Sequence, residues 1–255
     1  MYMTEKTFET ERILYRDDAC IVVNKLPGEA LETRSDKKGT NYVFLPDLLC
    51  ENLGLNKVYV SHRLDVPVSG AVLLATDSKS LAFFNRVFAG GKGEGRPQKL
   101  YWAIVEKNRA LENLLGVQTS AELCHWLSVD GRHNKSYAHS EPGPNRFESR
   151  LRWRFMGMGE RYAFIEIDLL TGRHHQIRAQ LAALGLAIKG DLKYGARRSE
   201  REGGIRLHSH FLSFPQPTDG EQLLRVLAEP PRMDNLWFAC SEAAKSSQIE
   251  ALGQK

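Results

Sequence analysis

Alternation of apolar and polar residues predicts most of the strands in this chain. The segment 11–25 (ERILYRDDACIVVNK) indicates two strands joined by an Asp-Asp turn and ended by Pro27 and Gly28. Residues 161–170 (RYAFIEIDLL) alternate as a half-buried strand does. We expect further strands at 70–76, 99–106 and 206–217.

Apolar residues at helical spacing predict helices over 45–55, 77–89 and 175–185. Asp77 is placed to cap the second helix, and Gly54 and Gly185 follow the ends of the first and third. Residues 107–149 are polar, and there we expect short strands and a long excursion. Strands and helices interleave without a regular β-α-β repeat. This favours an α+β fold with a mainly antiparallel sheet.

The composition is that of an ordinary globular protein, with 42% hydrophobic and 26% charged residues among 255. No apolar run approaches the roughly 18 residues needed to cross a bilayer, and the first 12 residues are too polar for a signal peptide. Cys20, Cys50, Cys124 and Cys240 form no C-x-x-C pair. We therefore expect free, buried thiols in a reducing cytoplasm, without a zinc knuckle or a disulfide framework.

The positive charge is concentrated in one part of the chain. The net charge is only +4, yet residues 171–206 hold eight Lys or Arg against three Asp or Glu. A solvated basic face is the ordinary explanation of such a run. A phosphate-binding surface is the alternative, and it requires other features of a site in the same segment.

An opposite-charge pair interrupts the segment 59–76 (YVSHRLDVPVSGAVLLAT). In an extended chain Arg63 and Asp65 point to the same side while Leu64 turns inward. Pro67 and Gly70 shape the loop that follows. A nearby cation favours the ionised form of a carboxylate, which can then act as a nucleophile or a general base. A structural ion pair that fixes a turn is the other interpretation.

Other groups suited to a nucleotide substrate follow downstream. Arg173 and Arg178 flank the start of the helix over 175–185, and Lys99 and Tyr101 share one face of a strand. Arginines bind phosphates, an aromatic ring can stack a flipped base, and an acid can perform chemistry on it. The set is what an enzyme acting on a nucleotide within a polymer needs.

Six motifs in order resemble those of the RluA-type family of RNA pseudouridine synthases, from about residue 11 to residue 237. They are IVVNK (21–25), HRLD with the following Ser-Gly (62–65, 69–70), K-x-Y-x-A-x-V (99–105), TGRHHQIR (171–178), GDLKYG (190–195) and LHSHFLSF (207–214).

The resemblance implies a single α+β catalytic domain, with two subdomains around a mainly antiparallel central sheet and a cleft. We assign residues 11–238 to it, residues 1–10 to an N-terminal extension and residues 239–255 to a C-terminal tail. The implied activity is the isomerisation of uridine to pseudouridine in structured ribosomal or transfer RNA. The resemblance further implies a monomer that needs no metal or other cofactor and has no membrane partner.

The resemblance also implies roles for single residues. Asp65 is the catalytic acid, which either attacks the anomeric carbon of the ribose or removes the neighbouring 2′ proton. Tyr101 packs against the target base, and Arg178 pairs with Asp65. Arg63 is expected to take part in flipping the nucleotide. The other substrate-binding positions are His62, Lys99 and Arg173.

The chain departs from the family pattern at two places. Val68 stands where the family usually has Thr, and NKLPG (24–28) replaces the usual NKPxG. Only about ten residues precede the first strand, so we expect no separate N-terminal RNA-binding domain. RNA selection then falls to the catalytic domain, with residues 90–99 and 193–206 as expected contacts.

Three other interpretations compete. A metal site is suggested by five histidines, His62, His174, His175, His208 and His210. No H-E-x-x-H motif accompanies them. The glycine-rich segment GGKGEGR (90–96) lacks the G-K-[ST] ending of a phosphate-binding P-loop. An RNA-binding module without catalytic activity is the alternative function.

Overall fold

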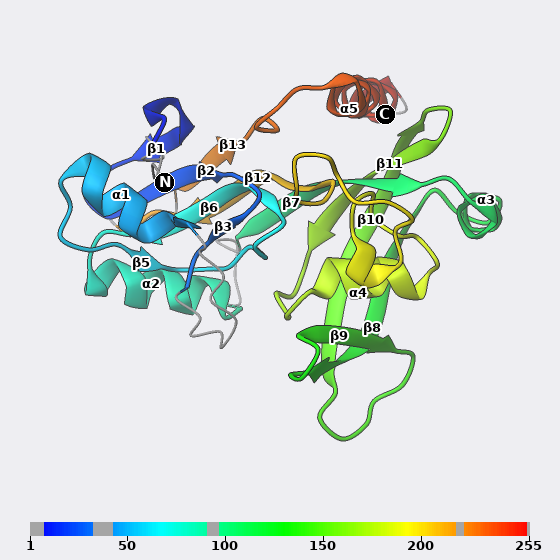
Figure 1. Ribbon diagram of the computed structural model, residues 1–255, viewed down its shortest axis with the longest axis horizontal. Helices are drawn as coiled ribbons and strands as arrows, with labels where there is room; N and C mark the ends of the chain where they lie inside the picture. Colours follow the sequence, from blue (N-terminus) through cyan, green and yellow to red (C-terminus); the bar gives the residue numbers. More distant parts are fainter. Residues whose placement is uncertain (1–7, 33–42, 91–96, 218–221, 254–255) are drawn as a thin grey trace, which may run out of the picture. The chain divides into compact units, whose positions relative to one another are not determined.

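The computed structural model describes residues 8–32, 43–90, 97–217 and 222–253 (Figure 1). The chain forms two compact units. Unit 1 consists of residues 1–97 and 211–231, and unit 2 of residues 98–210 and 232–255. Strand β12 (Leu207–Pro215) contributes residues to both units.

Unit 1 contains a mainly antiparallel sheet that begins with the predicted hairpin. Its strands are β1 (Ile13–Arg16), β2 (Cys20–Lys25), β5 (Tyr59–Val60), β6 (Ser69–Ala75), the end of β12 and β13 (Leu223–Leu227). Asp17 forms the turn between β1 and β2, since its Oδ1 accepts from the backbone N–H groups of Ala19 and Cys20 at 2.8 and 2.7 Å. The predicted Asp-Asp turn is therefore confirmed. A 3-10 turn, η1 (Thr10–Arg12), precedes β1, and β3 (Glu29–Ala30) pairs in parallel with β4 (Val43–Phe44).

Both predicted helices of unit 1 are present, as α1 (Leu45–Leu53) and α2 (Ser78–Phe88). Asp77 caps α2 by accepting from the N–H groups of Lys79 and Ser80. Gly54, at φ +63°, ends α1 in the left-handed conformation that favours glycine. Phe84 of α2 is fully buried beside β6, every residue of which is buried. The core of unit 1 thus lies between this helix and its sheet.

Unit 2 contains a second run of antiparallel strands, in the order β7, β11, β10, β8, β9. Their bounds are β7 (Gln98–Glu106), β8 (Ser120–Asp130), β9 (Lys135–His139), β10 (Phe147–Met158) and β11 (Tyr162–Leu169). The prediction for residues 107–149 was wrong about strand length, because β8 has 11 residues and a helix, α3 (Arg109–Leu115), precedes it. Along β8 partly exposed and exposed residues alternate and only Leu127 is buried, so no apolar face marked the strand.

Two helices cover opposite faces of this sheet. The predicted helix α4 (Gln176–Ala183) packs on the face that carries Leu127 of β8. Helix α5 (Asn235–Gly253) packs on the other face, with Trp237 and Cys240 against Phe164 of β11. α5 continues through residue 238, where we placed the end of the catalytic domain.

These elements confirm the predicted α+β class with a mainly antiparallel sheet. The prediction of buried thiols holds for Cys20 and Cys240 but is wrong for Cys124, which is exposed, and Cys50 is half-buried. Cys124 belongs to the polar face of β8. No helix in the described ranges is long and apolar enough to span a bilayer.

Candidate active site

The HRLD motif forms the loop between β5 and β6 in unit 1. The N–H of Val68 donates to the carbonyl of Asp65 at 3.0 Å, which closes a turn around Val66 and Pro67. Leu64 is buried, Arg63 is exposed and Asp65 is half-buried, as the predicted alternation requires. The guanidinium of Arg63 forms an exposed ion pair with Glu32 at 3.1 Å.

A fully buried lysine supports this loop. The Nζ of Lys25, at the end of β2, donates to the carbonyls of Leu26, Val66 and Val68 at 2.9, 3.1 and 2.6 Å. Burial lowers the pKa of Lys25 to about 7, and the negative charges of Glu29 and Asp65 oppose this shift. Only an ammonium has three protons to donate, so the three carbonyls are all satisfied in the charged form.

A second charged group fixes the segment beside Lys25. The carboxylate of Glu29 accepts from Arg12 at 2.6 Å and from the N–H of Leu26 at 2.8 Å, and Gly28 N–H donates to Val66 at 2.8 Å. The backbone at both ends of the Pro-Gly turn is therefore tied to the Asp65 loop. Sequence reasoning missed this support, although a lysine ending an apolar strand was a visible signal.

His62 lies inside unit 1. Its Nε2 accepts from the backbone N–H of Leu73 on β6 at 3.0 Å, and its ring lies 4.9 Å from that of Phe88. An accepting Nε2 carries no proton, so this histidine is neutral with its proton on Nδ1. His62 is thus placed to hold the HRLD loop on β6, and its expected contact with substrate stays a prediction.

Strand β7 carries Tyr101 and Lys99 in unit 2. Tyr101 is 4% exposed, and Lys99 is half-buried. The Nζ of Lys99 lies 3.6 Å from the position that a Cβ on Gly172 would occupy, so it borders the TGR turn. Gln176 holds this turn, because its Oε1 accepts from Thr171 at 2.8 Å and from the N–H of Arg173 at 3.0 Å.

Arg173 is exposed at the start of α4. Its guanidinium lies 5.4 Å from the ring centre of Phe147, which is itself 54% exposed. An aromatic ring and a cation that face solvent together can stack on a base and bind a phosphate. Sequence reasoning did not single out Phe147, because it falls in the polar middle region.

Arg178 is buried on α4 and pairs with a carboxylate. Its Nε and Nη2 donate to Oδ2 and Oδ1 of Asp191 at 2.7 and 2.8 Å. Asp191 belongs to the GDLKYG motif, and sequence reasoning did not predict this pair. The partner that the resemblance implies, Asp65, belongs to unit 1, and its pairing with Arg178 stays a prediction.

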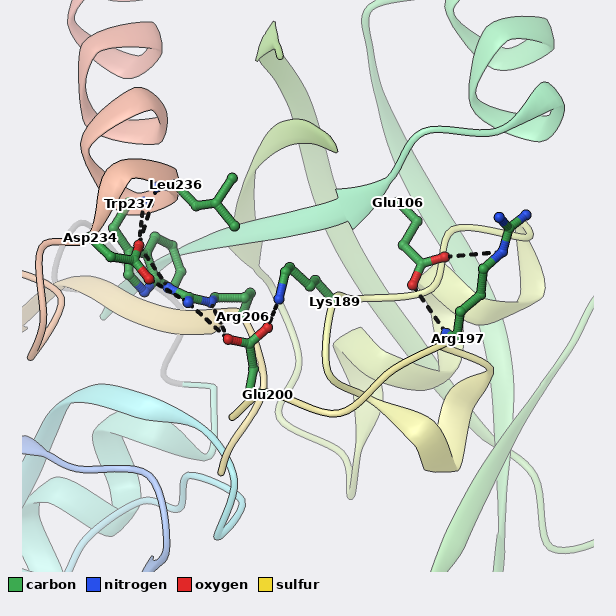
Figure 2. Close-up of polar contacts among 8 residues, drawn as sticks. All are labelled: Glu106, Lys189, Arg197, Glu200, Arg206, Asp234, Leu236 and Trp237. Atoms are coloured by element: carbon green, nitrogen blue, oxygen red, sulfur yellow. Dashed lines mark hydrogen bonds and ion pairs between the residues drawn. The ribbon is translucent and has the colours of Figure 1, made fainter. Parts of the chain in front are cut away.

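Several cations of the basic segment 171–206 contact carboxylates. Figure 2 shows Glu200 between Lys189 and Arg206, with Asp234 on the other side of Arg206. Arg197 contacts Glu106, at 3.1 Å through its backbone N–H and 3.6 Å through its guanidinium. Together with Arg178 on Asp191, these pairs neutralise part of the predicted basic surface. The glycine-rich segment 90–96 lies mostly outside the described residues.

The histidines of unit 2 pack against aromatic rings. His210 stacks on Trp102 with ring centres 3.6 Å apart, and His174 stacks on His175 at 3.8 Å. In the described ranges no three His, Cys, Asp or Glu side chains gather closely enough to hold a metal ion. The metal-site interpretation of the histidines therefore finds no support in the described part of the chain.

Comparison with known proteins gives a consistent result. A family model described as RNA pseudouridylate synthase matches residues 19–183. An uncharacterized RNA pseudouridine synthase of Zymomonas mobilis is 27% identical over 211 residues, 80% of this chain and 87% of that protein. The tRNA pseudouridine synthase C of Yersinia pestis is 28% identical over 223 residues, 83% of each chain.

A solved structure has the same fold. Human RNA pseudouridylate synthase domain containing 1 aligns with a TM-score of 0.68 at 24% identity, over 89% of this chain and 86% of that one. The family model covers more than half of the sequence. The chain therefore belongs to the RNA pseudouridylate synthase family of isomerases, as its RluA-type motifs predicted.

Proposed function

We propose that this protein converts specific uridines of structured ribosomal or transfer RNA to pseudouridine, with Asp65 as the catalytic acid. The observation that carries the proposal is the Asp65 loop, whose backbone carbonyls accept from Lys25 and from the Gly28 N–H in a chain of this family. A reacting group that is already held in one geometry lowers the entropic cost of reaching the transition state.

The reaction balances without a cofactor. The bond between uracil N1 and the ribose C1′ breaks, the uracil turns, a bond from C5 to C1′ forms, and the proton on C5 leaves. Asp65 begins this sequence either by attacking C1′ or by removing the 2′ proton. The proton lost from C5 is balanced by one gained at N1, and no electrons enter or leave overall, so the reaction needs no redox cofactor.

The groups of unit 2 supply what the detached base needs. Tyr101 packs against the uracil, and the Arg178 guanidinium pairs with the Asp65 carboxylate. Arg63 and His62 take part in placing the target nucleotide. A site that excludes water retains the free uracil while it turns and keeps the carboxylate reactive.

RNA binds through positively charged groups around the TGR turn. Arg173 and Lys99 contact phosphates, and the exposed ring of Phe147 stacks on a nucleotide beside the target. One relative is named a tRNA pseudouridine synthase, which supports transfer RNA as the first substrate to test. We further propose a cytoplasmic monomer whose catalytic domain is residues 11–238.

The test uses transfer and ribosomal RNA purified from cells that lack this gene. The protein is incubated with each RNA without added cofactor, and the nucleosides are separated by chromatography after digestion. We expect pseudouridine from the wild-type chain and none from Asp65→Asn, which should still bind RNA because phosphate contacts dominate affinity. Asp47→Asn, at an exposed carboxylate on α1, is the matched control and should remain active.

Two outcomes would contradict the proposal. Pseudouridine from Asp65→Asn at the rate of the control would remove Asp65 from the mechanism. RNA binding by the wild-type chain without any product would favour the catalytically inactive RNA-binding module.

A further inference from the structure

Two residues of the GDLKYG segment, Asp191 and Tyr194, contact the Arg178 side chain. Asp191 is 2% exposed and binds Arg178, which is 5% exposed, through two parallel hydrogen bonds. Paired bonds of this kind fix the plane of a guanidinium as well as its position. Removing either partner would leave the other charge buried without compensation, which is costly.

Tyr194 contacts Arg178 from a second side. Its ring centre lies 4.9 Å from the guanidinium carbon of Arg178. The ring is fixed by its hydroxyl, which accepts from the N–H of Ser136 at 2.8 Å and lies 3.2 Å from that residue's carbonyl. The Nδ1 of His175 lies 3.0 Å from the same hydroxyl. Strand β9 and the TGRHHQIR motif therefore both hold the ring in place.

The backbone of the segment explains why both side chains reach the same arginine. Asp191 and Tyr194 stand three residues apart around the 3-10 turn η2 (Leu192–Tyr194), and residues at this spacing eclipse each other. Gly190 has φ +91°, and a Cβ there would lie 2.9 Å from Glu200 and 3.1 Å from the carbonyl of Gly204. The turn therefore requires glycine at its start.

We infer that Asp191 and Tyr194 are positioning residues that set the orientation of the Arg178 guanidinium for its role with Asp65. This inference rests on the proposed function, because it assigns Arg178 to the reaction. An arginine side chain has many rotamers, and fixing it before substrate binds removes the cost of ordering it during the reaction. Arg178 is the reacting partner, and the turn acts only through it.

Asp191→Asn is the main test, because asparagine keeps the shape and removes the charge. We expect a loss of kcat of about 10²-fold, which is the scale of a misplaced group, with little change in KM for the RNA. Tyr194→Phe keeps the ring and loses its hydroxyl bonds, so a smaller loss of about tenfold is expected. Glu166→Gln breaks another arginine–carboxylate pair of unit 2, with Arg154 at 2.8 Å, and should keep its kcat.

A double variant distinguishes positioning from a general structural effect. If Asp191 acts through Arg178, then Asp191→Asn should add nothing to the loss caused by Arg178→Ala. Equal losses from Asp191→Asn in the wild-type and the Arg178→Ala backgrounds would overturn the inference. A rise in KM with kcat unchanged would do the same.

A measurement without catalysis separates this inference from the proposed function. The exchange of the Arg178 Nε–H with solvent is followed by nitrogen-15 NMR, with the signal assigned through Arg178→Lys. Asp191→Asn should accelerate this exchange by about tenfold or more, while Glu166→Gln leaves it unchanged. Unchanged exchange in Asp191→Asn would refute the positioning role. An inactive wild-type chain would refute only the proposed function.

Discussion

Two buried cations, Lys25 in unit 1 and Arg178 in unit 2, are held in different ways. Lys25 donates to three neutral carbonyls, those of Leu26, Val66 and Val68. Arg178 donates twice to the carboxylate of Asp191. Lys25 holds backbone carbonyls through single hydrogen bonds. The two bonds from Arg178 to one carboxylate fix the orientation of its guanidinium plane.

The difference has a consequence for pH dependence. Burial lowers the pKa of Lys25 to about 7, so its charge changes near neutral pH. An arginine does not deprotonate in proteins, and a carboxylate partner compensates its burial. The charge of Lys25, and with it the support of the Asp65 loop, should therefore change near neutral pH. An ordinary lysine, with a pKa near 10.4, would stay charged there.

The largest expected effect is on the free energy of unfolding. Between about pH 7 and pH 10.5 the unfolded chain keeps the Lys25 proton and the folded chain does not, so stability rises with pH in this window. The contribution from pH 7 to pH 9 is about 2 kcal/mol. Urea unfolding at several pH values, for the wild-type chain and Lys25→Met, isolates it as the difference in slope.

Lys57→Met is the matched control for this prediction, since Lys57 is exposed in the same unit. Its slope between pH 7 and pH 9 should equal that of the wild-type chain. A Lys25→Met slope equal to both would show that Lys25 stays charged when folded, and the contrast with Arg178 would disappear.

Local patterns in the sequence were enough to predict the elements that frame both cations. The hairpin of β1 and β2, helices α1, α2 and α4, and strands β6, β7, β11 and β12 follow from period, caps and breakers. Helix α5 was missed, because its residues from 239 onward were taken as a tail. Strands β8 and β10 were missed or shortened because polar side chains alternate with partly exposed ones along them.

The contacts of the two cations could not be predicted in the same way. Val66 and Val68 are 41 and 43 residues from Lys25, and Ser136 is 58 residues from Tyr194. Nothing local in the chain indicates such pairings, because they depend on which strands become neighbours. The motifs identified Asp65, Tyr101 and Arg178 as a set, whereas the groups that hold the Asp65 loop and Arg178 came only from the structure.

A second prediction compares a buried arginine with an exposed one. Arg173 faces solvent over Phe147, so its loss should weaken RNA binding rather than the chemical step. Phe147→Ala should raise the Kd for RNA about tenfold, as the loss of one stacked base does, without changing the salt dependence. Arg173→Ala should lower the slope of log K against log salt by roughly 0.7 to 0.9.

Filter binding at several salt concentrations measures both quantities. Phe238→Ala is the control, because Phe238 is an aromatic residue on α5 that is 59% exposed. Its Kd should match that of the wild-type chain. If Phe147→Ala behaved like Phe238→Ala, the exposed ring would have no part in RNA binding, and the role of Arg173 would be that of a charge alone.

The smallest expected effect concerns another arginine–carboxylate pair of unit 2. Asp234 binds Arg206 and also caps α5, since its Oδ1 accepts from the N–H groups of Leu236 and Trp237 at 3.2 and 3.1 Å (Figure 2). Burial raises the pKa of Asp234, but the bonds from Arg206 and the helix outweigh it and lower the pKa below the ordinary 3.8. The pair's stabilisation is therefore present at neutral pH and is lost as the pH falls below that value.

Asp234→Ala should cost about 1 kcal/mol of unfolding free energy, the usual cost of losing a helix cap, while Asp234→Asn should cost less because asparagine also caps. Turnover per folded molecule should not change in either variant, in contrast to Asp191→Asn. Thermal unfolding at pH 7 together with the pseudouridine assay measures both. If Asp234→Asn lowered kcat as much as Asp191→Asn does, the loss would be a property of any broken arginine pair in unit 2. The distinction between a positioning carboxylate and a purely structural one depends on that comparison.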